Sequence, residues 1–365
     1  MVLLQRYLAT TSLLLIASTA LALPMDRLRF PPGFKLEQVA HVDNARQLAQ
    51  APDGTLFVGS YRAGKVYRLA ATADGYSQPQ VIIDDLPLPS GIAFHQGALY
   101  IAALNRILRL DNPLSAQPAT PVILTDQLPQ KKQHGWKYLK VGPDQQLYFN
   151  IGAPCNSCLS DNPLFATLAR MPLSGGPVEV IAQGVRNSVG FGWHPADQAL
   201  WFTDNGRDWL GDNSPDDELN RLAQPGQHFG FPYRHARTVI DPQYKQFPAP
   251  DSQPPVALLG AHVAPLGMAF SQQPPWAEPG ETALFIAQHG SWNRTEKVGY
   301  EVIRVRLKGN KVIAQESFIK GWLRHGSYWG RPVDVMFTKD KEGADSSLLI
   351  SDDYGDAIYQ MTPLP

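Results

Sequence analysis

The sequence contains few cysteines and almost no net charge. Its only cysteines are Cys155 and Cys158, so no second cysteine pair exists that could complete a four-ligand zinc site. The chain has 32 Lys and Arg against 33 Asp and Glu, which gives a formal net charge of −1. Proteins that bind nucleic acid carry a basic surface, so this balance argues against a nucleic-acid partner and favours a small neutral ligand.

The cysteine pair allows two interpretations. Leu159 follows Cys158, whereas attachment of a c-type haem would require a histidine at that position. In an oxidising compartment we expect a local disulfide between Cys155 and Cys158. The disulfide would either staple a loop or form a redox-active wall of a site, and the sequence leaves both interpretations open.

Long apolar runs are confined to the start of the chain. Residues 1–22 contain one arginine, an apolar run from about Leu8 to Ala20 and the small-residue pattern Ala20-Leu21-Ala22. This order is typical of a secretory signal peptide cleaved after Ala22, whereas the alternative, a membrane anchor, needs roughly 18 to 20 apolar residues. We therefore expect a periplasmic or secreted protein without stable membrane insertion after cleavage.

No long stretch with helical periodicity follows the signal, and an internal repeat is present in its place. Each copy contains an apolar strand, a turn, a strand rich in aromatic and branched residues, and a third strand. The copies begin at Leu48, Gly91, Leu139, Phe191, Met268 and Asp334. Units of about 40 to 80 residues with short strands predict an all-β protein, a six-bladed β-propeller formed by residues 23–365 as a single domain. Insertions are expected at about 223–265, between the fourth and fifth copies, and at about 321–331.

Polar residues precede the first strands of two copies. His134 could act as a general base from a loop at the propeller mouth, although a loop histidine taken alone is more often structural. Arg186 and Asn187 could hold a carboxylate or polarise a carbonyl, although an ordinary turn with a surface ion pair would look the same. His289, Arg294 and Arg331 occupy similar places in the last two copies. If the ring closes, all of these side chains converge on one mouth.

An acidic segment, DNGRDWLGDNSPDDELN, occupies positions 204–220. Its carboxylates and loop carbonyls are the hard oxygen ligands that calcium prefers. The spacing does not match an EF-hand, which needs Gly at its sixth position and Glu at its twelfth. By composition, a calcium site and a solvated acidic loop are equally good interpretations.

These motifs together resemble a known family, the soluble quinoprotein sugar dehydrogenases that include glucose and sorbosone dehydrogenases. The resemblance covers nearly all of the chain after the signal. Its motifs are H-x4-L-x3-PD-x2-LY at 134–148, G-x-RN-x2-G at 184–190, and a G…DDELN segment at 206–220 followed by FGFPY at 229–233.

The resemblance implies a six-bladed propeller that binds pyrroloquinoline quinone (PQQ) and Ca²⁺. By this likeness, His134 is the base that takes the substrate hydroxyl proton while hydride passes to the quinone C5. Arg186, with Asn187 beside it, would polarise the C5 carbonyl, and Ca²⁺ would act there as a Lewis acid. Arg331 would face the cofactor carboxylates, and His289 or Arg294 would take the place of a cofactor-contacting lysine.

The resemblance also implies metal ligands and shows departures. Gly206 and Arg207 would offer their backbone carbonyls to calcium, while Asp217 and Glu218 match an acidic pair that serves a further calcium site. Gln133 stands where the glucose enzymes have an acid, and Pro89-Ser90 where they have a glutamine. These differences bear on substrate identity and on whether PQQ binding is retained.

The sequence therefore predicts an exported PQQ- and Ca²⁺-dependent dehydrogenase that oxidises an aldose or a related sugar aldehyde or alcohol. Because the chain has no haem motif, electrons would leave to an external acceptor such as a soluble cytochrome or a quinone. Two alternatives stay open, a Ca²⁺-dependent propeller lactonase and a non-catalytic propeller that binds sugar or a partner protein.

Overall fold

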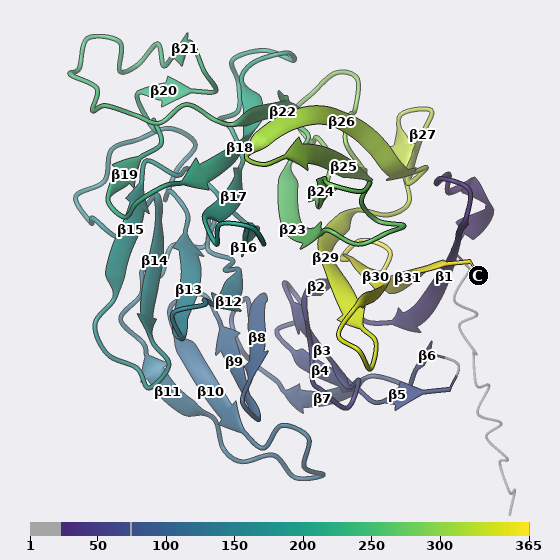
Figure 1. Cartoon of the computed structure of the whole chain (residues 1–365). Coiled ribbons are helices and arrows are strands. Elements are labelled where there is room, and N and C mark those ends of the chain that lie inside the picture. Colours follow the sequence, from purple (N-terminus) through teal and green to yellow (C-terminus); the bar gives the residue numbers. More distant parts are fainter. Residues whose placement is uncertain (1–22, 74, 365) are drawn as a thin grey trace, which may run out of the picture.

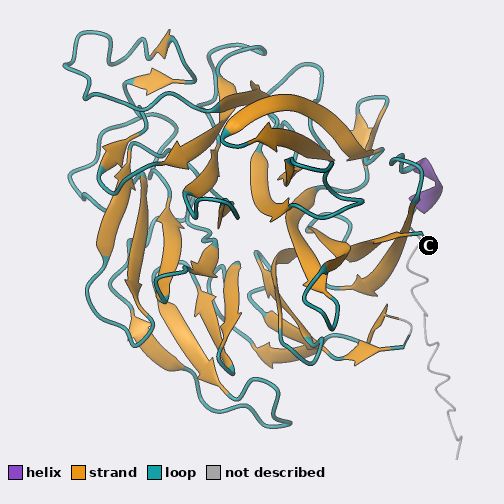
Figure 2. Cartoon of the chain, viewed as in Figure 1, coloured by secondary structure: helices purple, strands orange, loops and turns teal. Residues whose placement is uncertain are grey.

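The computed structural model describes residues 23–73 and 75–364, so the predicted signal peptide lies outside the described residues. Six sheets of four or more strands stand around a central axis, as the six blades of a β-propeller (Figure 1). Strands dominate, and the described residues contain one short 3-10 helix, η1 (Met25–Arg27) (Figure 2). The prediction of a six-bladed all-β propeller is confirmed.

Each blade runs outward from an inner strand at the axis. Blade 1 comprises β2 (Ala45–Gln50), β3 (Leu56–Ser60), β4 (Val66–Leu69) and β7 (Gln80–Ile83). Blade 2 comprises β8 (Gly91–His95), β9 (Ala98–Ala102), β10 (Ile107–Asp111) and β11 (Val122–Thr125). Blade 3 comprises β12 (Leu139–Val141), β13 (Gln146–Ile151), β14 (Thr167–Pro172), β15 (Glu179–Gln183) and β19 (Gln227–His228).

The second half of the chain forms the other three blades. Blade 4 comprises β16 (Phe191–Trp193), β17 (Leu200–Asp204), β18 (Asp216–Leu222) and β22 (Ala257–Ala261). Blade 5 comprises β23 (Pro265–Ser271), β24 (Thr282–Gln288), β25 (Glu301–Lys308) and β26 (Lys311–Lys320). Blade 6 comprises β29 (Pro332–Lys339), β30 (Asp345–Asp352), β31 (Ala357–Pro363) and β1 (Phe34–His41). Small hairpins are formed by β5 (Ala71–Thr72) with β6 (Gly75–Tyr76), β20 (Arg234–His235) with β21 (Val239–Ile240), and β27 (Leu323–Arg324) with β28 (Ser327–Tyr328).

The two ends of the described chain close the ring. The first strand, β1, pairs antiparallel with β31, in a register that runs from Phe34↔Pro363 to His41↔Ala357. Figure 1 shows β1 and the C-terminus side by side. Blade 6 therefore takes its outer strand from the beginning of the chain and its three inner strands from the end.

Apolar clusters fill the spaces between neighbouring blades. One cluster joins β9 of blade 2 to β13 of blade 3, and another joins β24 of blade 5 to β30 of blade 6. Every residue of β3, β9 and β24 is buried, because both faces of these strands pack against a neighbour. This packing explains why the strands are continuously apolar instead of alternating.

The turns between strands use the residues that the repeat supplies. In blade 1 the Asp53 carboxylate accepts the Thr55 N–H at 3.0 Å, and the Gly54 N–H reaches the Ala51 carbonyl at 3.0 Å. Gly54 adopts φ +87°, a left-handed conformation that glycine tolerates without a Cβ clash.

The long insertion lies inside a blade and not between two blades. We expected it between the fourth and fifth copies, but β22 pairs with β18 and completes blade 4. The insertion therefore separates the third and fourth strands of that blade. Part of it, β19, adds to blade 3 by parallel pairing with β15. Within 23–73 and 75–364, no helix has the length and apolar character that crossing a membrane requires.

Candidate active site

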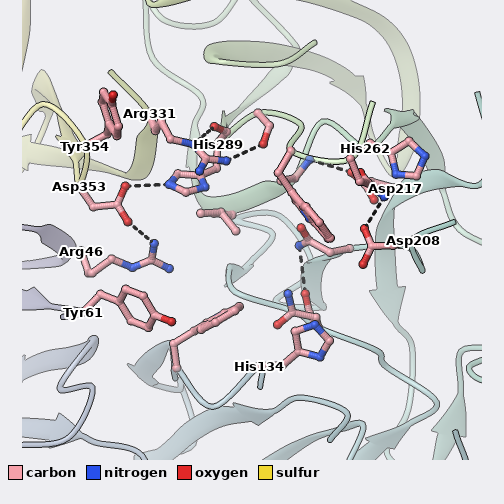
Figure 3. Close-up of a pocket in the computed structure, with 18 of the residues that line it drawn as sticks. Arg46, Tyr61, His134, Asp208, Asp217, His262, His289, Arg331, Asp353 and Tyr354 are labelled. Carbon is pink, nitrogen blue, oxygen red and sulfur yellow. Dashed lines mark hydrogen bonds and ion pairs between the residues drawn. The ribbon is translucent and has the colours of Figure 1, made fainter. Parts of the chain in front are cut away.

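Loops from most blades enclose a cavity of about 460 Å³ at one mouth of the propeller (Figure 3). This volume lies in the range of about 300 to 1,000 Å³ that is usual for small-molecule and cofactor sites. Of the residues predicted to form a site, seven line the cavity: His134, Arg186, Asn187, Gly206, Asp217, His289 and Arg331. Residues from distant parts of the sequence thus meet because the ring closes.

His134 is a buried, neutral base. Its Nδ1 lies 2.9 Å from the Ala153 carbonyl, which can only accept, so Nδ1 carries the proton and Nε2 keeps its lone pair. Burial, with a further contribution from the nearby Arg186 cation, lowers the pKa of His134 to about 3. The ring also contacts Trp136 edge to face, with centroids 5.8 Å apart. The histidine is therefore held in one tautomer that can accept a proton.

Arg186 is anchored within the cavity wall. Its guanidinium donates to the Asn156 carbonyl and the Asn156 amide oxygen, both at 2.8 Å. It also donates to the Asn205 carbonyl at 3.1 Å and to the Asp208 carboxylate at 3.1 Å. An arginine has five N–H donors, so these contacts leave one, on Nη1, for a ligand. The Arg186 guanidinium is thus fixed in the cavity wall, and one of its N–H groups remains available to a ligand.

Asn187 presents a buried acceptor without a partner. Its Oδ1 has no hydrogen bond from any residue that the structure describes, although it is shielded from solvent. Its backbone N–H donates to the Asp204 carboxylate at 2.6 Å, which also accepts the Arg186 N–H at 2.8 Å. Leaving a buried acceptor unpaired costs about 1 to 3 kcal/mol. Such an orphan in a cavity wall points to a donor on a bound ligand.

Three buried carboxyl groups lie together behind this wall. Asp204 of β17 stands directly opposite Glu218 of β18, and Asp217 precedes Glu218. Burial raises the pKa of Asp204 and of Asp217 to about 7 and that of Glu218 to about 8, and repulsion by Asp204 adds to the shifts of both partners. Arg186 opposes the shifts of the two aspartates. A group of acids that repel one another in this way is a favourable environment for an additional cation.

The oxygen atoms near Asp217 are suitable ligands for a calcium ion. Asp217 accepts the Gly206 N–H at 2.7 Å and the Ala264 N–H at 2.8 Å, which fixes its carboxylate at the cavity wall. Among residues 23–73 and 75–364, none donates a hydrogen bond to the carbonyl oxygen of Gly206 or of Arg207. Carbonyl and carboxylate oxygens are the ligands that calcium takes. These three residues are therefore free to contribute oxygens to such an ion.

Glu218 and Arg207 have other partners as well. The Glu218 carboxylate accepts the Ala236 N–H at 2.6 Å and the Asn220 side-chain amide at 2.8 Å, away from the cavity lining. The Arg207 guanidinium pairs with the buried Asp241 at 2.6 Å. Glu218 thus lies inside blade 4, and the side chain of Arg207 is engaged with Asp241, so its backbone carbonyl is the remaining candidate ligand, although Arg207 does not line the cavity.

The opposite wall contains a chain of charged and polar contacts that sequence reasoning partly missed, in which burial lowers the pKa of His289 to about 4. The Asp353 carboxylate lies 2.8 Å from Arg46 and 2.7 Å from Nε2 of His289 (Figure 3). Although burial alone raises the pKa of Asp353, His289 and Arg46 hold it well below its usual range. Arg331 donates to the His289 carbonyl at 3.0 Å and to the Gly290 carbonyl at 2.7 Å. Arg46 is the second residue of β2, two residues before Leu48, at which the first copy of the repeat begins, and this position was the available signal.

Like Arg207 and Glu218, three further predicted site residues lie outside the cavity lining: Arg294, Cys155 and Cys158. Arg294 donates instead to the Asp212 carbonyl and to Asn213 at 2.9 Å, on an exposed loop, so its predicted place against a cofactor is not the one it occupies. Cys155 and Cys158 form the expected disulfide, but neither lines the cavity. Asn156, which lies between the two cysteines, accepts hydrogen bonds from Arg186. The disulfide loop therefore supports the position of the Arg186 side chain.

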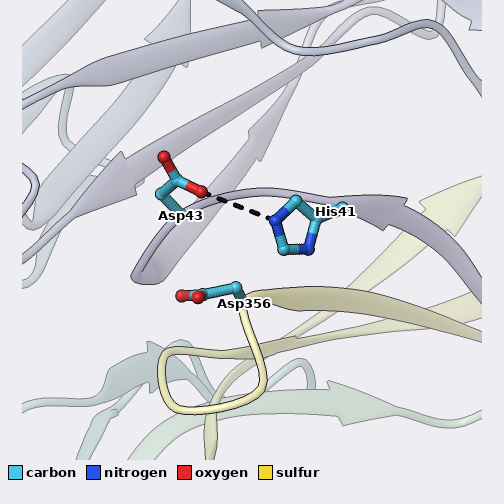
Figure 4. Close-up of side chains that lie close together, drawn as sticks. All are labelled: His41, Asp43 and Asp356. Carbon is cyan, nitrogen blue, oxygen red and sulfur yellow. Dashed lines mark ion pairs between the residues drawn. The ribbon is translucent and has the colours of Figure 1, made fainter. Parts of the chain in front are cut away.

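Figure 4 shows a second group of possible metal ligands. His41, Asp43 and Asp356 place their ligand atoms within 4.8 Å of one another, and His41 lies 3.6 Å from Asp43. His41 and Asp43 are exposed, and none of the three lines the cavity. Because water solvates exposed charges without a bound ion, this group alone does not define a metal site.

The chain is similar in sequence to a known protein over almost its whole length. It is 31% identical over 372 residues to an uncharacterized protein of Borreliella burgdorferi, covering 96% of this chain and 95% of the other. The chain belongs to the same family as this protein. A family model described as TrAA12-like matches residues 236–320, which span the later part of the insertion of blade 4, β22 and all of blade 5.

Solved structures of low sequence identity share the fold. The holo form of the pyranose dehydrogenase PQQ domain from Coprinopsis cinerea superposes with a TM-score of 0.74 at 18% identity, covering 92% of this chain and 97% of that chain. The calcium structure of Trichoderma reesei Carbohydrate-Active Enzymes Family AA12 gives 0.75 at 18%, covering 92% and 97%. The PQQ-bound aldose sugar dehydrogenase from Streptomyces coelicolor gives 0.64 at 21%, covering 92% and 99%. The predicted resemblance to PQQ-dependent sugar dehydrogenases is thus confirmed in the fold.

Proposed function

We propose that this protein is an oxidoreductase that oxidises an aldose or a related sugar aldehyde or alcohol, with PQQ as cofactor and Ca²⁺ as bound metal. The observation that carries the proposal is a neutral, buried His134 in a cavity whose opposite wall carries Arg46 and Arg331. A base is needed to remove a hydroxyl proton, and arginines bind the carboxylates of an anionic cofactor. The shared fold of PQQ-bound and calcium-bound proteins supports this assignment.

The residues that would hold the two groups lie on different walls. Bound PQQ would supply a hydride acceptor, and bound Ca²⁺ a Lewis acid. Arg331 retains the donors of Nη1, and within the described part of the chain the Arg46 guanidinium hydrogen-bonds only to Asp353, so both can bind carboxylates. The carbonyls of Gly206 and Arg207 and the carboxylate of Asp217 would hold calcium. The unpaired Oδ1 of Asn187 would accept a hydrogen bond from the ligand.

His134 moves the proton in this scheme. Its Nε2 accepts the proton of the substrate hydroxyl, while Nδ1–H stays bonded to the Ala153 carbonyl and stabilises the imidazolium that forms. Because the pKa of His134 in the ligand-free protein is about 3, the base is available over the whole neutral and mildly acidic range. Trp136, which packs edge to face against the ring, helps to keep it in place.

The test is reconstitution of the purified protein. PQQ and Ca²⁺ are added together and separately, and dye reduction is followed across a panel of aldoses. We expect reduction only with both additions and a loss of at least about a hundredfold in kcat for His134→Ala, since general-base catalysis contributes about 10² to 10⁴. His95→Ala, which removes a half-buried histidine remote from the cavity, serves as the control.

Two outcomes would contradict the assignment. Absence of PQQ binding in a spectral titration would refute the dehydrogenase, and hydrolysis of lactones with Ca²⁺ alone would support the lactonase instead. A cavity that binds sugars without turnover would indicate the non-catalytic alternative. The three results are distinct in the same set of assays.

We also propose that the protein acts outside the cytoplasm and passes its electrons to an external acceptor. The order of charged, apolar and small residues in 1–22 supports export. Sequencing the N-terminus of the protein recovered from the periplasm or medium should give Leu23 as the first residue. An intact Met1 on the recovered protein would contradict cleavage.

A further inference from the structure

Two tryptophans lie exposed at the mouth of the cavity. Trp209 and Trp292 are each 64% exposed, and their rings meet edge to face with centroids 5.3 Å apart. Trp292 itself lines the cavity. Among the described residues no other tryptophan is as exposed. Exposed aromatic patches mark ligand grooves or interaction surfaces, so the position of this tryptophan pair needs an explanation.

Hydrogen bonds in the polar wall of the cavity fix the residues adjacent to the two tryptophans. Asp208 accepts a hydrogen bond from the Asn293 side chain at 2.7 Å, and these two residues directly precede Trp209 and directly follow Trp292. The other Asp208 oxygen binds Arg186 at 3.1 Å. Both indoles are therefore carried on backbone that is fixed to the candidate active site, while their rings point to solvent.

The backbone of Trp209 is strained. It adopts φ +70°, a left-handed conformation that is uncommon for a bulky side chain. Such conformations persist where the surrounding structure enforces them, and they cluster at functional sites. Here the Asp208 backbone N–H donates to the Asn156 amide oxygen at 2.8 Å, and the Asp208 carbonyl accepts from the same amide at 3.1 Å, so the turn before Trp209 is fixed.

We propose that the tryptophan pair stacks a sugar ring of an oligosaccharide substrate, adjacent to the unit whose end enters the cavity. This inference rests on the proposed function. A pyranose ring presents C–H groups on its faces, which pack against an aromatic face, and its hydroxyls accept from an indole N–H. Two perpendicular indoles offer both kinds of contact to a neutral ring.

The size of the cavity directs further sugar units to its mouth. A volume of about 460 Å³ must contain a tricyclic cofactor and the reacting sugar. A longer substrate would therefore leave its remaining rings at the rim, where Trp292 continues the cavity wall. A protein acceptor is the other possible occupant, but stable protein interfaces bury about 1,200 to 2,000 Å², far more than two indoles supply.

The experiment compares substrates of different length. The holoprotein is assayed with glucose, maltotetraose and cellotetraose for the wild type, Trp209→Ala and Trp209→Tyr. We expect Trp209→Ala to lower the ratio of kcat/KM for the better tetrasaccharide to that for glucose by about tenfold, and Trp209→Tyr to keep it within about threefold. Phe247→Ala, which removes a 52% exposed aromatic outside the cavity lining, should leave the ratio unchanged.

A binding measurement separates this inference from the proposed function. Saturation-transfer NMR follows the same tetrasaccharides on the PQQ-free protein. If no sugar is oxidised but Trp209→Ala weakens tetrasaccharide binding, the stacking site stands and the dehydrogenase fails. An unchanged ratio together with unchanged binding would overturn the stacking site. It would also be overturned if Trp209→Ala slowed only the reduction of an added cytochrome c.

Discussion

The buried acids of blade 4 make stability depend on pH and on calcium. Burial raises the pKa of Asp204 and of Asp217 to about 7 and that of Glu218 to about 8. An acid with a raised pKa in the folded state contributes stability that is fully present below its unfolded value, near 4, and is lost as pH rises through the folded value. Without a cation, the protein should therefore lose stability progressively between about pH 4 and pH 8.

The magnitude follows from the shifts. A change from 3.8 to about 7 corresponds to about 4 kcal/mol for one carboxyl group. Urea unfolding in EDTA should thus show a free energy of unfolding several kcal/mol lower at pH 9 than at pH 5, with the decline complete by about pH 8. Ca²⁺ in excess should restore much of the lost free energy of unfolding, because its positive charge compensates the ionised carboxylates of blade 4.

Glu218→Gln isolates one member of the cluster. Glu218 accepts a hydrogen bond from the Asn220 side chain at 2.8 Å, while the Asn220 Oδ1 is buried and unpaired. Rotation of the Asn220 amide would let it accept from the new glutamine, so the variant keeps its hydrogen bonds. We expect Glu218→Gln to be more stable than the wild type at pH 9 in EDTA and to show a shallower pH dependence.

The control for this variant is Glu278→Gln, which removes an exposed carboxylate and should leave the pH dependence unchanged. A wild-type free energy of unfolding that is flat from pH 5 to pH 8 in EDTA would refute the reasoning. So would a Glu218→Gln protein that is less stable than the wild type at pH 9.

Three further predictions concern the walls of the cavity. Arg46→Leu should raise the dissociation constant for PQQ at least tenfold in a spectral titration, because a charged hydrogen bond is worth about 1.5 to 3 kcal/mol; an unchanged constant would remove Arg46 from the cofactor site. Because His134 is neutral in the free protein down to a pKa of about 3, the profile of kcat/KM against pH should lack an inflection near 6.5; an inflection lost in His134→Ala would contradict its burial. Replacing Cys155 and Cys158 with serine should lower the free energy of unfolding by about 2 kcal/mol, as expected for a short loop. It should also lower kcat, because Asn156, which hydrogen-bonds to Arg186, would be held less firmly. An unchanged kcat would show that the disulfide does not support the site.

The repeat made the architecture predictable, but not the way the ring closes. Each copy has a local pattern of strand, turn and strand, and the inner strands begin within a few residues of the expected positions. The pairing of β1 with β31 leaves no local signal, because it joins segments more than 300 residues apart, such as His41 with Ala357. The strand β22 was also missed, since five small or apolar residues within a Pro-rich stretch do not stand out.

The residues of the candidate site were likewise predictable from the sequence only in part. His134, Arg186 and Asn187 could be proposed because each precedes a first strand, where loops meet at the mouth. Asp353 could not, because its role depends on Arg46 and His289, which come from other blades. The Trp209 and Trp292 side chains are likewise ordinary in sequence and acquire meaning only from their contact across two blades.

The central claim is that His134 is the base in a PQQ-dependent oxidation, and a single-turnover measurement tests it most directly. The absorbance of PQQ bound to the protein with Ca²⁺ is followed after mixing with an excess of aldose. We predict rapid reduction with a primary isotope effect for sugar deuterated at the oxidised carbon. His134→Ala should bind PQQ as tightly as the wild type but reduce it at least about a hundredfold more slowly. Failure of the wild type to bind PQQ, or reduction by His134→Ala at the wild-type rate, would contradict the account.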